Sequence, residues 1–180
     1  MAKSVTDVVC CYVALGSNLG NSVDYLHKAI KAIESHPLTS NLKTSNLYQS
    51  EPHGPQDQPD YINAAVSFYT SLEAEELLNF LQQIENDNAR VRQGVQRWGA
   101  RTLDLDLLFY GEQIINTRRL TVPHPRICER VFVLYPLRDL LKDSEEFLQD
   151  LKINQSTTLQ DCIDELPEVE ITNIKDIGHA

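Results

Sequence analysis

Two aspartates two positions apart, Asp104 and Asp106, are the side chains of this chain best placed for chemistry. They alternate with Leu103, Leu105 and Leu107, a pattern typical of a strand with one buried face. Side chains two apart on a strand point to the same face, about 7 Å along it, so the two carboxylates should lie side by side. Mg²⁺ is usually held by one or two carboxylates together with substrate phosphates. Alone, such a pair is a weak signal, because an exposed strand face can be acidic without binding metal.

Positive charge is concentrated around these aspartates, although the chain as a whole is acidic. The formal net charge of the 180 residues is −10, which argues against a nucleic-acid partner bound by a basic surface. Residues 90–130 contain eight arginines and no lysine. Because guanidinium groups bind phosphate oxygens in a bidentate manner, this segment favours a phosphate ligand over a set of solvated surface charges. The arginines of this segment are Arg90, Arg92, Arg97, Arg101, Arg118, Arg119, Arg126 and Arg130.

Composition predicts one globular domain. With 42% hydrophobic residues, a chain of this length can bury a sizeable core. It has no run of about 18 apolar residues and no signal-peptide pattern, so we expect a cytoplasmic protein without a membrane partner. The cysteines form no C-x-x-C motif, and we expect reduced structural thiols with neither a zinc site nor a disulfide. They are Cys10, Cys11, Cys128 and Cys162.

The hydrophobic pattern predicts the order β-α-β-β-α-β. One helix should begin at a cap formed by Asn21 or Ser22 and end near Glu34. A second should run from a Ser71 cap to about Ala89. This order is ferredoxin-like, an α+β fold in which an antiparallel sheet carries helices on one face. The four strands are expected over residues 8–15, 43–50, 61–69 and 103–110.

Additional elements are expected after the fourth strand. A tight turn at Gly111 should lead residues 113–116 back along that strand as an added hairpin. Residues 126–138 have the pattern of a helix broken near Pro136. The remainder, about 141–180, should form a small helical or irregular appendage.

The chain is therefore expected to be a single domain, 1–180, whose motif-bearing core spans about 8–140. Two long loops, 51–60 and 90–100, interrupt it. Loops of this length without apolar periodicity are more often functional than mere connectors.

Four motifs follow one another in this core. They are GSNLG at 16–20, GPQDQPDYINAAV at 54–66, RWGARTLDLD at 97–106 and LTVPHP at 120–125. Together they closely resemble the 6-hydroxymethyl-7,8-dihydropterin pyrophosphokinase family of folate biosynthesis. The resemblance runs in collinear order from about residue 8 to 140 and does not extend to the C-terminal forty residues.

The resemblance implies a reaction and its ligands. Members of this family move the β,γ-pyrophosphoryl group of ATP to the hydroxymethyl oxygen of a reduced pterin, using two Mg²⁺ ions and releasing AMP. Asp104 and Asp106 would carry both metal ions, and Arg90 and Arg92 would act with them in catalysis. The implied partners are these two small-molecule substrates only, bound by a monomer.

The resemblance also assigns binding positions. Those implied for ATP are Gln82, Glu85, Arg90, Arg92, Arg101, Leu107, Arg119, Thr121, His124 and Arg130. Those implied for the pterin are Ser50, His53, Tyr61, Asn63, Trp98, Asp104 and Phe132. Residues 88–97 are expected to close over the phosphates as a lid.

Several of these residues have a structural alternative. Asn63 lies in an apolar strand, where a buried amide can have a purely structural role. A hydrogen bond from this amide to the edge of the pterin ring is the better explanation. Phe132 could equally be helix core. Trp98 lies in a polar loop, which disfavours core packing. Gln82 and Glu85 are three apart on one helix face, which is more often simply solvated.

A few positions depart from the family pattern. Gln93 and Gly94 follow Arg92 where a cation is familiar, His53 replaces an aliphatic residue, and Pro125 replaces a tyrosine found in some members. His124, held between prolines, is expected to be neutral or weakly basic and to donate a hydrogen bond to phosphate rather than act as a base.

Two other functions are compatible with the carboxylate pair. A two-metal phosphohydrolase or nuclease would use Asp104 and Asp106 but would leave Trp98, Asn63 and the 54–61 loop unexplained. A catalytically inactive binding module of ferredoxin-like fold would have no use for the intact carboxylates, for Arg92 or for His124. The formation of AMP from ATP and a reduced hydroxymethylpterin separates all three.

Overall fold

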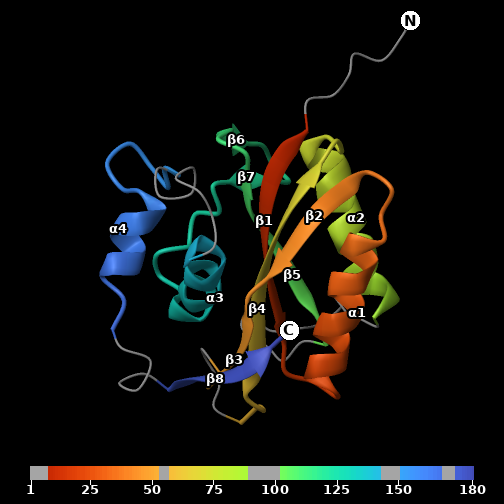
Figure 1. Ribbon diagram of the computed structural model, residues 1–180, viewed down its shortest axis with the longest axis vertical. Coiled ribbons are helices and arrows are strands. Elements are labelled where there is room, and N and C mark those ends of the chain that lie inside the picture. Colours follow the sequence, from red (N-terminus) through yellow and green to blue (C-terminus); the bar gives the residue numbers. More distant parts are fainter. Residues whose placement is uncertain (1–7, 53–56, 89–101, 143–150, 168–172) are drawn as a thin grey trace, which may run out of the picture.

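The computed structural model describes residues 8–52, 57–88, 102–142, 151–167 and 173–180. Its centre is a six-stranded antiparallel sheet of order β5-β1-β4-β3-β8, in which β2 also pairs with β4 (Figure 1). The strands are β1 (Val9–Ser17), β2 (Thr39–Thr44), β3 (Asn46–Ser50), β4 (Tyr61–Thr70), β5 (Asp104–Tyr110) and β8 (Ile174–His179).

The predicted element order is confirmed, and with it the ferredoxin-like arrangement. Helix α1 (Ser22–Glu34) follows β1, and α2 (Ala74–Asp87) joins β4 to β5. The side chain of Asn21 accepts a hydrogen bond from the Asp24 amide, so the predicted cap of α1 is also confirmed. The single strand expected over 43–50 is two strands separated at Ser45, whose Oγ accepts the Ala65 N–H at 2.9 Å.

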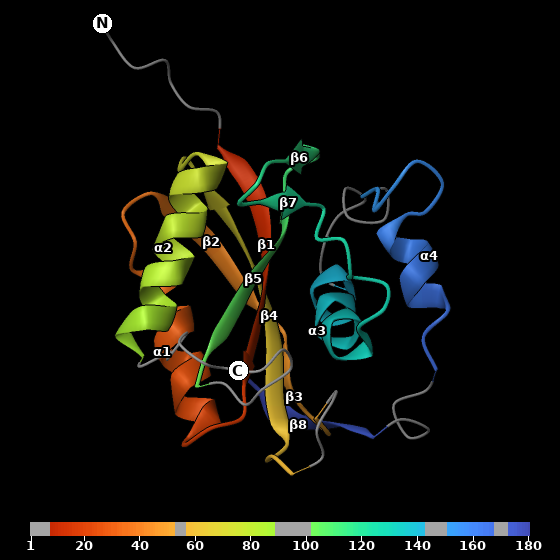
Figure 2. The ribbon, with the colours of Figure 1, turned by 180° about the vertical axis from the view of Figure 1, so that it is seen from behind.

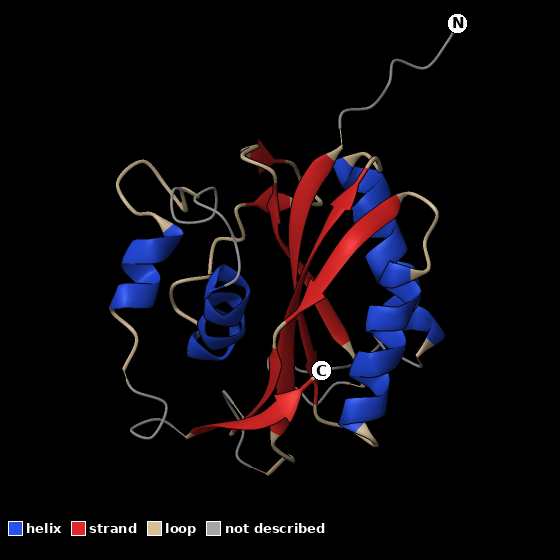
Figure 3. Ribbon diagram, viewed as in Figure 1, coloured by secondary structure: helices blue, strands red, loops and turns tan. Residues whose placement is uncertain are grey.

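Helices cover both faces of the sheet, so the expectation of helices on one face was wrong. Helices α1 and α2 pack on one face, and α3 (Val131–Lys142) packs on the other, next to α4 (Leu159–Asp164) (Figures 2 and 3). The cause lies in β1: Val13 is buried under α1 and α2, while Tyr12 is buried in the cluster beneath α3. None of the helices in the described part of the chain is long and apolar enough to cross a membrane.

The added hairpin forms with different partners from those predicted. Residues 113–116 do not return along β5. Instead β6 (Ile115–Asn116) pairs with β7 (Thr121–Val122) as a separate two-stranded sheet. The outer edge of β5 is taken by the segment that follows, because the His124 N–H donates to the Leu108 carbonyl at 2.9 Å.

Two helix boundaries also differ from the prediction. The cap of α2 is Glu73 rather than Ser71, because the chain is still turning at Leu72, whose N–H donates to Thr70 Oγ1 at 3.1 Å. Residues 126–130 form turns, and α3 then runs through Pro136 to Lys142 without a break.

The C-terminal segment contains a strand that the sequence did not indicate. Residues 174–179 have little apolar alternation, yet they form β8 and pair with β3 at the edge of the sheet. The segment expected to be an appendage is therefore part of the main sheet.

The expectation of four reduced cysteines was wrong for two of them. Cys128 and Cys162 form a disulfide with their Cα atoms 5.4 Å apart, whereas Cys10 and Cys11 are free. The partners are 34 residues apart and meet because α4 packs beside the turn that precedes α3, a tertiary contact without a local sequence signal.

Removing this disulfide should lower stability. Cross-linking a loop of 34 residues lowers the conformational entropy of the unfolded chain. In the loop-entropy model this raises the free energy of unfolding by about 3–4 kcal/mol. We expect Cys128→Ser, at an exposed position, to lose that much free energy of unfolding in urea relative to the oxidised protein. The reduced wild type is the control and should match the variant. Equal stability of the oxidised wild type and the variant would contradict the prediction.

Candidate active site

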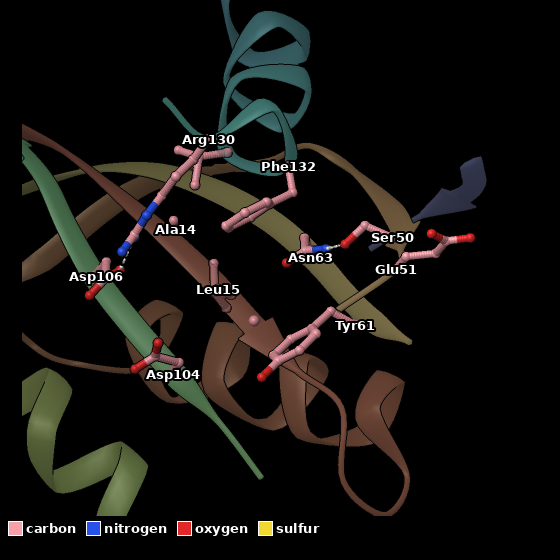
Figure 4. Close-up of a pocket in the computed structure, with 12 residues that line it drawn as sticks. Ala14, Leu15, Ser50, Glu51, Tyr61, Asn63, Asp104, Asp106, Arg130 and Phe132 are labelled. Carbon is pink, nitrogen blue, oxygen red and sulfur yellow. Dashed lines mark hydrogen bonds and ion pairs between the residues drawn. The ribbon is translucent and has the colours of Figure 1, made fainter. Parts of the chain in front are cut away.

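One pocket brings together residues from four strands and from the start of α3 (Figure 4). It lies where the ends of β1, β3, β4 and β5 face the first turn of α3. Seven residues named from the sequence line it, although they are spread over more than eighty positions of the chain. They are Ser50, Tyr61, Asn63, Asp104, Asp106, Arg130 and Phe132.

The two aspartates point into this pocket from β5. Both are partly exposed, while Leu105 and Leu107 are buried on the opposite face, so the predicted geometry of the pair is confirmed. Asp106 Oδ2 accepts a hydrogen bond from Arg130 Nη1 at 2.8 Å in an ion pair. The Arg130 side chain is only 16% exposed, and its Nε is buried without a partner in the described structure.

The chemistry of these donors fits a hard cation that also binds a phosphorylated ligand. Among the described residues, no three His, Cys, Asp or Glu side chains cluster closely enough to enclose a metal ion. Two carboxylates at the mouth of a pocket leave the remaining coordination positions to water and to ligand oxygens. That is the usual arrangement for Mg²⁺ bound with a nucleotide.

A buried glutamate on α2 supports the strand between the two aspartates. Glu85 is 2% exposed, and its Oε1 accepts the Leu105 N–H at 2.9 Å. The solvated-face alternative is therefore wrong for Glu85, whereas Gln82 on the same helix is half-buried. Because Leu105 lies between Asp104 and Asp106, this bond fixes the backbone that carries both carboxylates.

Glu85→Ala should destabilise the protein and weaken the site together. The Leu105 N–H would lose its acceptor in a buried environment, which costs about 1–3 kcal/mol. Glu85→Gln keeps an accepting oxygen at the same position and should lose less stability and less activity. Urea unfolding and turnover rates of both variants check this. Equal losses in the two variants would show that the hydrogen bond to Leu105 is unimportant.

The opposite end of the pocket combines a fixed amide with aromatic walls. Asn63 is buried, and its Nδ2 donates to Ser50 Oγ at 2.8 Å and to the Tyr48 carbonyl at 3.4 Å. With the nitrogen so directed, the amide oxygen faces the pocket (Figure 4). Tyr61 and Phe132 lie on opposite sides of the space (Figure 4). A flat ring with hydrogen-bond donors on one edge suits this arrangement.

His124 lies next to the charged end of the pocket. Burial lowers its pKa below the ordinary value, outweighing the nearby Asp106 charge, which raises it. Its Nδ1 accepts the Arg126 N–H at 3.3 Å, which leaves the ring proton on Nε2. Both observations favour a neutral ring, and donation of a hydrogen bond from His124 to phosphate stays a prediction.

Six of the residues implied for ATP lie outside the lining of this pocket. Arg119 is turned towards α2, where it contacts Glu75 at 3.0 Å and Asn79 at 2.6 Å. Leu107 has a buried side chain, so a contact between this residue and a nucleotide would use its backbone. The six are Gln82, Glu85, Leu107, Arg119, Thr121 and His124.

Five of the predicted site residues lie outside the described residues. They include both arginines of the expected lid, so the lid stays a prediction. The five are His53, Arg90, Arg92, Trp98 and Arg101.

The structure also adds pocket residues that sequence reasoning missed. Gly16 lies in the GSNLG motif, which was a usable signal, and Ala14 and Leu15 precede it on β1. Glu51 follows Ser50 directly, but an exposed acidic residue at a strand end carries no signal of its own. Val133 could only be found from the packing of α3 against the sheet.

Comparisons with known proteins agree with this geometry. The family model described as 7,8-dihydro-6-hydroxymethylpterin-pyrophosphokinase matches residues 12–142. A 2-amino-4-hydroxy-6-hydroxymethyldihydropteridine pyrophosphokinase from Haemophilus influenzae is 49% identical over 136 residues, which are 76% of this chain and 84% of that protein. The protein of the same name from Bacillus subtilis is 44% identical over 135 residues, 75% of this chain and 80% of that protein.

A solved structure is similar in fold. The chain matches a crystal structure of Plasmodium falciparum HPPK-DHPS with pteroate at a TM-score of 0.65. The match covers 91% of this chain and 43% of that chain, at 13% sequence identity. At that identity the likeness shows the shared fold alone.

Proposed function

The chain belongs to the 7,8-dihydro-6-hydroxymethylpterin-pyrophosphokinase family, and from this premise we propose how its pocket carries out the reaction. The protein transfers the pyrophosphoryl group of ATP to the hydroxymethyl group of 6-hydroxymethyl-7,8-dihydropterin, a step of folate biosynthesis. Asp104, Asp106 and the Asn63 amide line the same pocket, and our assignment of residues rests on this observation.

The pterin binds in the half of the pocket formed by Asn63, Ser50, Tyr61 and Phe132. The Asn63 oxygen accepts from the donor edge of the ring, and the two aromatic side chains cover its faces. Ser50 holds the amide in the orientation that this contact needs. The hydroxymethyl group then points to Asp104, and the same assignment extends to His53 and Trp98.

The phosphates of ATP bind at the charged end. Two Mg²⁺ ions held by Asp104 and Asp106 would stabilise the negative charge that shifts between the attacking and leaving oxygens. Arg130 is already directed to this point by its ion pair with Asp106. The neutral His124 donates from Nε2. Arg90 and Arg92 neutralise the transferred group.

The reaction is then an in-line substitution at phosphorus. The pterin hydroxyl loses its proton to solvent and its oxygen forms a bond to the β-phosphorus of ATP. The bond from that phosphorus to the oxygen shared with the α-phosphate breaks, and AMP leaves with that oxygen and the bonding electron pair. Most of the catalysis comes from positioning and electrostatic stabilisation, as in other phosphoryl transfers. The remaining nucleotide contacts are assigned to Gln82, Glu85, Arg101, Leu107, Arg119 and Thr121.

Product analysis tests this function against its alternatives. The purified protein should form AMP and a pterin diphosphate in equal amounts, only when ATP, the reduced hydroxymethylpterin and Mg²⁺ are all present. Release of inorganic phosphate or pyrophosphate from ATP alone would indicate a phosphohydrolase. Absence of turnover with intact binding of both ligands would indicate a binding module.

We also propose that residues 1–180 form one domain. In support, β8 belongs to the sheet that holds β1 and β5. Action as a monomer, in the cytoplasm and without a nucleic-acid partner, stays a prediction.

A further inference from the structure

The C-terminal strand β8 lies beside the pocket but outside the segment that matches the family model. That match ends at residue 142, and β8 begins at Ile174. The strand pairs with β3, with one register shift between Leu47 and Tyr48, and Ile174 lies opposite Ser50. Ser50 is the residue whose hydroxyl holds the Asn63 amide, so β8 fixes the backbone of a pocket residue directly.

A polar contact continues this pairing beyond the end of β3. Asn173 Nδ2 donates to Glu51 Oε2 at 2.7 Å. Glu51 follows Ser50 and lines the pocket, while Asn173 precedes Ile174. The two chain segments, 122 residues apart, are therefore joined on both sides of the Ser50–Ile174 pair.

The same strand also supports the other wall of the pocket. Ile174 is 4% exposed and forms a hydrophobic cluster with Tyr48 and Tyr135. The partly buried ring of Phe132 packs against this cluster. Ile174 thus connects Ser50 on β3 with Phe132 on α3, which face the pocket from different elements (Figure 4).

We propose that Asn173 and Ile174 are positioning residues for the pterin half of the pocket, acting through Ser50, Glu51 and Phe132. This inference rests on the proposed function, because it takes that half to be the pterin site. The carboxylates lie on β5 at the other edge of the sheet, separated from β8 by β1, β4 and β3. Substitutions in β8 should therefore affect the pterin and leave ATP unaffected.

The test compares three alanine variants in the full chain. Ile174→Ala should raise the KM for the reduced pterin by about tenfold and Asn173→Ala by about threefold, while the KM for ATP changes by less than about twofold. Ile177→Ala is the matched control, because Ile177 lies on the same strand with 44% of its surface exposed. It should resemble the wild type in both constants. Ile174→Val, which keeps most of the packing, should restore most of the pterin affinity.

The outcomes distinguish a failure of the positioning role from a failure of the proposed function. An equal rise in both KM values, or no rise in either variant, would overturn the positioning role while leaving the enzyme active. If Ile174→Ala does not fold, Asn173→Ala decides the matter, because its side chain is exposed and its contact is polar. A folded wild type that forms no AMP would instead overturn the proposed function, and this inference with it.

Discussion

Asp104→Asn and Asp106→Asn should each lower kcat by about 10³-fold or more, a loss of about 4 kcal/mol of transition-state stabilisation. Asparagine keeps the size of the side chain but removes the negative charge that a hard cation requires. Both carboxylates face the pocket, and the leucines between and beside them already fill the core. The loss should therefore appear in the rate and far less in the fold. Steady-state kinetics at saturating Mg²⁺ measures it.

Thermal unfolding separates the two variants. Asp104→Asn should melt at the temperature of the wild type or above it, because one of two neighbouring negative charges is removed. Asp106→Asn should melt at a lower temperature, because it leaves the mostly buried Arg130 without its ionic partner. Glu112→Gln, at an exposed turn, is the control for loss of an acidic charge and should change neither quantity. Wild-type rates in either aspartate variant would show that the pair holds no catalytic metal.

Asn63→Leu should lower kcat/KM for the pterin by about 10²-fold, equivalent to about 2.7 kcal/mol, while ATP affinity stays near that of the wild type. The leucine has a similar size but cannot accept from the donor edge of the ring. Ser50→Ala leaves the amide in place without the hydroxyl that orients it, and we expect a smaller loss, about tenfold. Titration with a pterin analogue and separately with ATP measures both affinities.

The result for ATP decides how this experiment is interpreted. Parallel losses of pterin and ATP affinity in Asn63→Leu would mean that the variant disturbs the whole pocket. Unchanged pterin affinity would show that Asn63 has only the structural role of a buried strand amide.

Local patterns in the sequence were sufficient for the elements that position the carboxylates. The alternation of leucine and aspartate predicted the two faces of β5, and Asn21 predicted the start of α1, because both signals depend on neighbouring residues. The element order followed from periodicity in the same way. The proximity of Asp106 to Arg130 required the tertiary fold, since neither residue indicates the other.

Three of the errors have a common physical cause, which is contact between segments that are distant in the sequence. The segment 113–116 was expected on β5 because it is close in sequence, but the backbone of His124 takes that edge. β8 forms because β3 offers an unpaired edge, although its own residues have weak strand character. Cys128 and Cys162 meet for a similar reason, through the packing of α4.

The role of Glu85 shows how burial can change the interpretation of a residue. Three positions from Gln82 on an amphipathic helix, it has the pattern of a solvated residue. In the fold it is buried and holds the backbone of Leu105. A charged residue on a helix near a predicted acidic strand can thus hold the backbone of a site as well as contact its ligand.

Counting the divalent ions bound at the site tests the central claim most directly. Mn²⁺ replaces Mg²⁺ and can be counted by electron paramagnetic resonance in the presence of a non-hydrolysable ATP analogue and a pterin analogue. The wild type should bind two Mn²⁺ ions per chain in that complex. A double variant, Asp104→Asn with Asp106→Asn, should retain at most the ion carried by the nucleotide. Two ions bound with equal affinity by the double variant would contradict the assignment of the metal site to these carboxylates.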